Sequence, residues 1–161
     1  MRLGAGGTWA IAASFIVAFM LSALPLPDWV MPWRPAWVPL VLAYWCLALP
    51  LRLGVVIAWI IGLLFDVLQG SLLGQHAFGL AIVAYFVVIY HRQIRVFPLF
   101  RQAVVIGSLV FVYSLAMLLI YNLIGSMKYG YDYLLTSVTS AILWPWLFIV
   151  LRDLRRRAGV E

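Results

Sequence analysis

Asp66 is the residue of this chain with the clearest capacity for chemistry, because it is the one acid inside a long apolar segment. A carboxylate at such a position costs free energy and usually faces other helices, where it is paired or hydrogen-bonded. It could act as a coupling or proton-relay acid, or as a hydrogen-bond centre that fixes helix packing around the Gly70–Gly74 connector. No base lies within the apolar segments, which favours the structural interpretation, and Arg34 is the candidate partner.

The two histidines and the single cysteine do not predict a metal or redox site. His76 and His91 lie at opposite ends of one apolar segment, so they cannot share a metal ion, and each is interpreted as a residue at the membrane surface. Cys46 alone cannot form an intrachain disulfide and is interpreted as a small hydrophobic residue. No nucleophile motif, phosphate-binding glycine loop or paired-carboxylate motif is present. The sequence therefore predicts no catalytic, cofactor-binding or metal-binding residues, and no cofactor.

The composition leaves almost no chain for a soluble domain. Of the 161 residues, 66% are hydrophobic and 10% are charged, too few polar groups to cover the surface of a soluble protein. One bilayer-spanning helix takes about 20 apolar residues, so six helices need about 120. We therefore expect a single transmembrane domain over residues 1–161, which acts through its helices and short loops.

Six apolar segments predict an all-α integral membrane protein, a bundle of six transmembrane helices. The predicted spans cover about residues 8–24, 37–49, 53–68, 77–90, 103–124 and 133–151. The second segment is short and contains Pro39, so a tilted helix, a locally thinned membrane and a re-entrant segment are alternatives. Charge favours six crossings: with both termini in the cytoplasm, nine arginines lie inside, and only Arg34 and Lys128 lie outside.

Residues near the ends of the segments fit this topology. Pro145, which follows Trp144, lacks a backbone donor and is predicted to bend the sixth helix. Trp29 and Trp33 lie in the outer connector, where a membrane-interface belt is favoured over a contact surface for a partner. The basic cluster at residues 152–157 anchors the topology and meets anionic membrane lipids, with contact to a cytoplasmic protein as the alternative. The net charge of +6 is thereby explained without nucleic acid, for which no basic patch with stacking platforms exists.

Several motifs, taken together, resemble a known family. In order along the chain they are RPAW at residues 34–37, YWCLALP at 44–50, FDVLQGSLLGQH at 65–76 and LWPW at 143–146. In this order and spacing the chain resembles the proteobacterial form of the MreD family of rod shape-determining proteins. The motifs are individually short, but their joint order is fairly specific, and the resemblance covers nearly the whole chain.

The resemblance implies a multi-pass protein of the bacterial inner membrane that belongs to the elongasome, the machinery of side-wall peptidoglycan synthesis. It implies binding to MreC, and through MreC a link to MreB, RodA and the partner transpeptidase of RodA. It also implies a fold similar to the substrate-binding components of energy-coupling vitamin transporters, and no established catalytic activity. Arg34, Asp66, Gly70 and Gly74 match the family pattern, but no role comes with the match.

Three functions are compared. A non-enzymatic scaffold of cell-wall elongation is favoured, since it needs no catalytic set and no extramembrane mass. A small-molecule or lipid-linked substrate carrier is the alternative, and it predicts a polar, ligand-sized cavity near Asp66 and Arg34. An integral-membrane enzyme acting on lipid is third, because it needs convergent titratable groups that the sequence does not supply. A homodimer is compatible with all three.

Overall fold

The computed structural model describes residues 5–125 and 130–159, and within these ranges it contains helices and no strand. Arg2 and Lys128, which entered the charge comparison above, lie outside these ranges. The long helices are α1 (Ala5–Ala23), α2 (Trp37–Ala48), α3 (Val55–Gln69), α4 (Gln75–Val96), α5 (Leu99–Leu123) and α6 (Leu135–Arg157). Two 3-10 turns, η1 (Met31–Trp33) and η2 (Tyr131–Leu134), precede α2 and α6.

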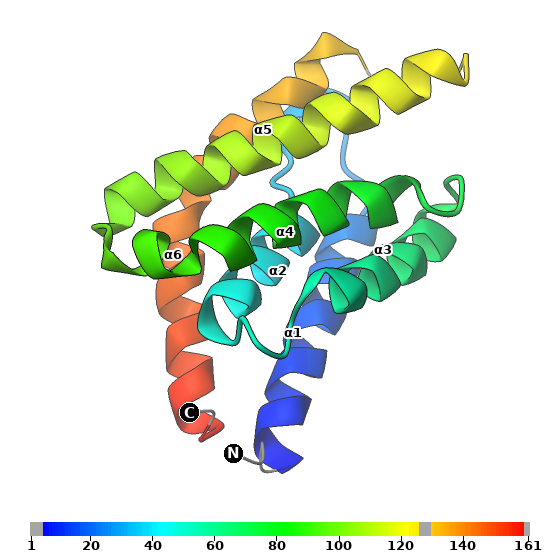
Figure 1. Ribbon diagram of the computed structural model, residues 1–161. Coiled ribbons are helices and arrows are strands. Elements are labelled where there is room, and N and C mark those ends of the chain that lie inside the picture. Colours follow the sequence, from blue (N-terminus) through cyan, green and yellow to red (C-terminus); the bar gives the residue numbers. More distant parts are fainter. Residues whose placement is uncertain (1–4, 126–129, 160–161) are drawn as a thin grey trace.

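The short helix α2 is the centre of the bundle. It is apolar on all sides, and such a helix must be surrounded by other helices. Ten of its 12 residues, Val38–Leu47, are buried, and it contacts α1, α4, α5 and α6. In Figure 1, α2 lies behind α4, between α1 and α6. Pro39 is tolerated because it lies in the first turn, where backbone N–H groups have no intrahelical partner, and the helix ends before Pro50.

Helices α3 and α4 form a closely packed hairpin. Gly62 of α3 lies against the backbone of α4, and a Cβ atom built on it would come within 2.2 Å of the Cα atom of Ala77. Gly107 of α5 packs in the same way against Ala141 of α6, at 2.6 Å between the built Cβ and the alanine Cβ. Small residues at these crossings let helices approach closely, as is typical of membrane bundles.

The lengths of the helices support a helical membrane protein, whereas six crossings stay a prediction. Helices α4, α5 and α6 are long and apolar enough to cross a membrane, and α1 and α3 are apolar but shorter. Helix α2, with 12 residues, is about 18 Å long at 1.5 Å per residue. The start of α1 and the end of α6 lie at the same end of the bundle (Figure 1), as an even number of crossings requires.

Two helices extend beyond the predicted spans. The fourth span was expected to end near residue 90 and the sixth near residue 151, but α4 continues to Val96 and α6 to Arg157. The basic segments that follow these spans are therefore largely helical. Their arginines therefore project from helix ends at fixed angular positions.

Candidate functional site

Asp66 lies in the last turn of α3, is fully buried, and binds the start of α4. Its Oδ1 atom accepts hydrogen bonds from the backbone N–H of His76 at 2.8 Å and from the hydroxyl of Ser71 at 2.9 Å. Its Oδ2 atom accepts from the backbone N–H of Gly74 at 2.8 Å and, more weakly, of Ala77 at 3.4 Å. A side-chain hydrogen bond of 2.7 Å also joins Oδ1 to Nδ1 of His76. We call Asp66, Ser71, Gly74 and His76 the turn cluster.

The physical reason for this geometry is the start of α4. The first N–H groups of a helix have no intrahelical partner and carry partial positive charge, so a carboxylate satisfies both needs. Such a cap is normally a residue directly before the helix. Here Gly74 holds that position and has no side chain to contribute, so the carboxylate of Asp66 reaches across from α3.

Gly70 and Gly74 shape the turn between the two helices. Gly70 follows α3 with φ 60°, and Gly74 precedes α4 with φ 98°. Both angles lie in the region that residues with a Cβ rarely adopt. Nothing lies within 4 Å of a Cβ built on either residue, so backbone conformation rather than space accounts for glycine at both positions.

The turn cluster contains an aspartate, a histidine and a serine, but they do not form a nucleophilic triad. In such a triad the serine is hydrogen-bonded to one imidazole nitrogen and the aspartate to the other. Here the Ser71 hydroxyl, at 3.1 Å, and the Asp66 carboxylate, at 2.7 Å, both lie against Nδ1 of His76. The arrangement holds the imidazole in place and offers no path for activating the serine.

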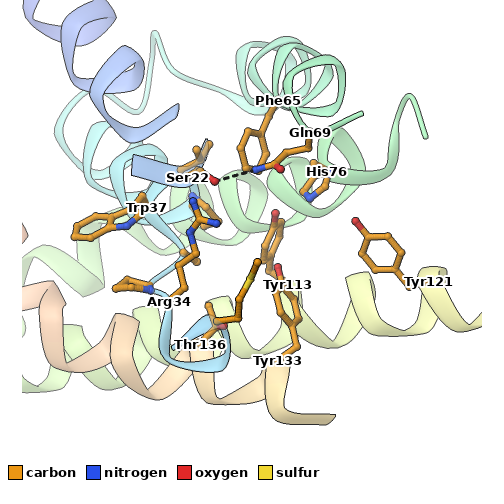
Figure 2. Close-up of a pocket in the computed structure, with 15 residues that line it drawn as sticks. Ser22, Arg34, Trp37, Phe65, Gln69, His76, Tyr113, Tyr121, Tyr133 and Thr136 are labelled. Atoms are coloured by element: carbon orange, nitrogen blue, oxygen red, sulfur yellow. Dashed lines mark hydrogen bonds between the residues drawn. The ribbon is translucent and has the colours of Figure 1, made fainter. Parts of the chain in front are cut away.

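Beside the turn cluster lies a cavity of about 70 Å³, drawn in Figure 2. Arg34, His76 and Tyr113 reach it from the connector before α2, from α4 and from α5. The guanidinium of Arg34 donates a hydrogen bond of 2.7 Å to the carbonyl oxygen of Leu21. Ligand pockets usually measure about 300–1,000 Å³, so this cavity has room for about two water molecules.

Arg34 was the expected partner of Asp66, and the structure shows a 2.7 Å contact of this carboxylate with His76. His76 was expected at the membrane surface, and no base was expected within the apolar segments. In fact His76 is buried, with 6% of its surface exposed, and its ring lies edge-on against Phe65. The signal that could have found it is a buried acid at a helix end, followed by two glycines and a histidine in the next helix start.

Comparison with known proteins gives a consistent result over nearly the full length. The family described as "rod shape-determining protein MreD" matches residues 5–154. A protein of Haemophilus influenzae named "Rod shape-determining protein MreD" is 31% identical over 153 residues, which cover 95% of this chain and 94% of the relative. The chain belongs to the MreD family. No solved structure matches it at a significant level.

Membership of the MreD family implies involvement in rod shape determination, and the family is not a known enzyme family. Among the side chains that the structure describes, no group of three or more His, Cys, Asp or Glu residues could hold a metal ion. The family match and the relative confirm, at the level of the family, the resemblance seen in the four sequence motifs.

Trp144 and Pro145 lie apart from the turn cluster in this MreD-family chain. Trp144 is fully buried in α6 and its ring packs against Phe148, with 6.0 Å between the ring centroids. Pro145 is half-buried, and α6 continues through it. Higher in the same helix, the hydroxyl of Ser140 accepts a 2.9 Å hydrogen bond from the backbone N–H of Ala36. Helix α6 therefore holds the connector that carries Arg34.

Arg95 is a polar residue to which sequence reasoning assigned no role beyond charge. Its guanidinium donates to the carbonyl oxygens of Leu47 and Ala48 at the end of α2, the latter at 2.7 Å. The last carbonyl groups of a helix have no intrahelical partner and carry partial negative charge, so Arg95 caps α2 from α4. Nothing in the sequence pattern links residues 47 and 95.

Proposed function

We propose that this protein is a non-enzymatic scaffold of the cell-wall elongation machinery in the bacterial inner membrane, where it crosses six times and binds MreC. Through MreC it connects with MreB, RodA and the transpeptidase that works with RodA. Family membership supports the rod-shape system. The bundle supports action through helix faces and short connectors, because all but a few of its described residues belong to the helices or to brief turns between them.

One observation carries the choice between a scaffold and a substrate carrier. The carrier hypothesis requires a ligand-sized polar cavity near Asp66 and Arg34. The cavity at that place measures about 70 Å³, several times smaller than the ~300 Å³ at the low end for small-molecule sites. Tyrosine, tryptophan and phenylalanine side chains occupy the space around it (Figure 2). A scaffold needs no cavity, and this is the function that the geometry supports best.

We propose a structural role for Asp66, Gly70 and Gly74 within this scaffold. The carboxylate of Asp66 is saturated by groups of the same chain. These bonds join the last turn of α3 to the first turn of α4, which is the arrangement that the unpaired N–H groups of a helix start require. We likewise propose that Arg34 positions the connector before α2, through its bond to Leu21 at the end of α1.

Helix α1 offers a surface that suits the single transmembrane helix of MreC. Its exposed side carries Ala12 and Ala13 between the larger residues Trp9 and Ile16. In a membrane, association of helices depends on close packing, and small residues on an exposed helix face allow it. We propose that the MreC helix docks on this side of α1.

The test is co-purification in detergent with tagged MreC from the same organism. We expect a stoichiometric complex with the unmodified protein, and loss of MreC from an Ala12→Leu/Ala13→Leu double variant. Ser108→Leu is the matched control, since it also enlarges a small exposed residue, on α5, and it should retain MreC. Asp66→Ala tests whether the turn cluster supports the interface, and Arg34→Ala tests the same for the connector before α2. Absence of any complex, with a folded and monodisperse protein, would reject the scaffold and favour the carrier.

A further inference from the structure

A second cleft, of about 800 Å³, opens at the end of the bundle where α6 terminates. Four arginines line it: Arg95 from the last turn of α4, and Arg152, Arg155 and Arg156 from the end of α6. Its volume is within the range of small-molecule sites, unlike that of the cavity beside the turn cluster. We call this cleft, with these four arginines, the arginine cleft.

The geometry of α6 determines which arginines of the basic cluster at residues 152–157 line the cleft. Residues 152, 155 and 156 follow the i, i+3, i+4 spacing that places side chains on one side of a helix. Arg157, the next residue, does not line the cleft, and its guanidinium pairs with Asp153 at 3.3 Å. One side of α6 thus presents three cations together, while the neighbouring side carries its own ion pair.

The positive charge of the cleft lacks a counter-charge from its own walls. No acidic residue lines it among the residues that the structure describes. Arg95 is partly compensated, because it donates to the carbonyl oxygens of Leu47 and Ala48. For Arg152, Arg155 and Arg156 no such hydrogen bond or ion pair is found in the described part of the chain. Guanidinium groups gathered in one cleft bind phosphate in bidentate geometry.

Apart from Gln102 of α5, the remaining walls of the cleft are mostly apolar and aromatic. Leu47 and Tyr44 come from the end of α2, and Phe148 lies one turn before Arg152 on α6. One helical turn corresponds to about 5.4 Å, so the wall changes from apolar to strongly basic over the depth of a lipid headgroup. A soluble phosphate compound has no apolar group that would contact the apolar part of the wall, whereas a phospholipid would place its glycerol and acyl chains there.

We propose that the arginine cleft binds the phosphate headgroup of an anionic phospholipid. The charge comes from the arginines, and the apolar wall receives the upper part of the acyl chains. This site differs from the general attraction of basic segments to a membrane surface, because it requires particular arginines on one side of α6. It does not depend on MreC binding, so it stands or falls separately from the scaffold.

The test is native mass spectrometry of the full chain in detergent, titrated with phosphatidylglycerol, cardiolipin or phosphatidylcholine. We expect saturable binding of the two anionic lipids and none of phosphatidylcholine beyond that of the detergent background. Arg156→Gln should weaken anionic binding about fivefold and Arg155→Gln/Arg156→Gln about twenty-fivefold, because one cation near a membrane surface contributes about 1 kcal/mol. Arg156→Lys, which keeps the charge, should lose less than Arg156→Gln.

Arg157→Gln is the matched control, because it removes the same charge one residue away, outside the cleft. It should change lipid binding less than twofold. Equal loss in Arg156→Gln and Arg157→Gln would overturn the proposal in favour of unspecific attraction. Displacement of the lipid by millimolar glycerol phosphate, or tighter binding of an oligoglutamate peptide with the same arginine dependence, would overturn it in favour of a soluble phosphate compound or an acidic protein segment.

Discussion

The turn cluster and the arginine cleft are two charged regions of one small bundle, and they differ in whether the charged groups are bonded within the chain. At the turn cluster, Asp66 is fully buried and each of its oxygens is bonded to groups of the same chain. In the arginine cleft, Arg152 and Arg156 are exposed and face an open volume. A buried charge must be satisfied by the fold itself, whereas exposed charges stay available to something outside the chain. The comparison separates residues that build the fold from residues that meet a partner.

The largest expected effect is at the turn cluster. Asp66→Ala removes the carboxylate that contacts the imidazole of His76 and accepts hydrogen bonds from the first N–H groups of α4. Removing one partner of such a buried pair costs about 3–5 kcal/mol. We expect a loss of this size in the free energy of unfolding, measured by denaturant titration in detergent micelles. Asp66→Asn should lose less, because one carbonyl oxygen still accepts hydrogen bonds.

Asp153→Ala is the control for Asp66→Ala. This aspartate is exposed and pairs with Arg157 across one helical turn, so its removal should change the free energy of unfolding by less than about 0.5 kcal/mol. If the two alanine variants were equally stable, the turn cluster would not hold the hairpin together. A native-like stability of Asp66→Ala combined with loss of rod shape in cells would instead support a functional acid.

The next largest loss of stability is expected at the crossing of α3 and α4, which brings the residues of the turn cluster together. Gly62→Ala places a methyl group 2.2 Å from the backbone of Ala77, so α3 and α4 must move apart. Overpacking of this kind costs about 1–3 kcal/mol, and here the obstacle is backbone that cannot change rotamer. Gly54→Ala is the matched control, since nothing lies within 4 Å of a Cβ built there. Both variants can be compared by thermal unfolding monitored by circular dichroism.

These residues also show how far sequence reasoning reaches in a membrane protein. Apolar segments of the right length predicted the helices, and the order of short motifs predicted the family. Asp66 was selected because an acid inside an apolar segment is a local signal, and Gly70 and Gly74 because they mark the connector after it and match the family pattern. His76 and Arg95 were not given their partners, because contacts 10 and 48 residues apart depend on how helices cross, which composition and periodicity do not encode. The size of the cavity beside the turn cluster could not be predicted from the sequence either, because it depends on side-chain packing.

A smaller effect is expected at the turn backbone. Gly74→Ala introduces a Cβ at φ 98°, where the strain costs about 1–2 kcal/mol. The side chain meets no atom within 4 Å, so the loss comes from conformation alone. Hydrogen exchange of the first turn of α4 should increase in this variant, because the N–H group of residue 74 would no longer lie at its present distance from Asp66. Unchanged exchange would mean that the turn adapts without disturbing the cap.

The smallest effects on stability are expected in the arginine cleft, and they differ between Arg95 and Arg156. Arg95→Gln removes hydrogen bonds to the end of α2, and we expect a loss of about 1 kcal/mol in the free energy of unfolding, reduced by exposure to water. Arg156→Gln removes no such bond and should stay within about 0.5 kcal/mol in lipid-free detergent. Adding phosphatidylglycerol should stabilise the unmodified protein and Arg157→Gln, but stabilise Arg156→Gln less. A lipid-independent loss of stability in Arg156→Gln would make the cleft another part of the fold, and the contrast with the turn cluster would disappear.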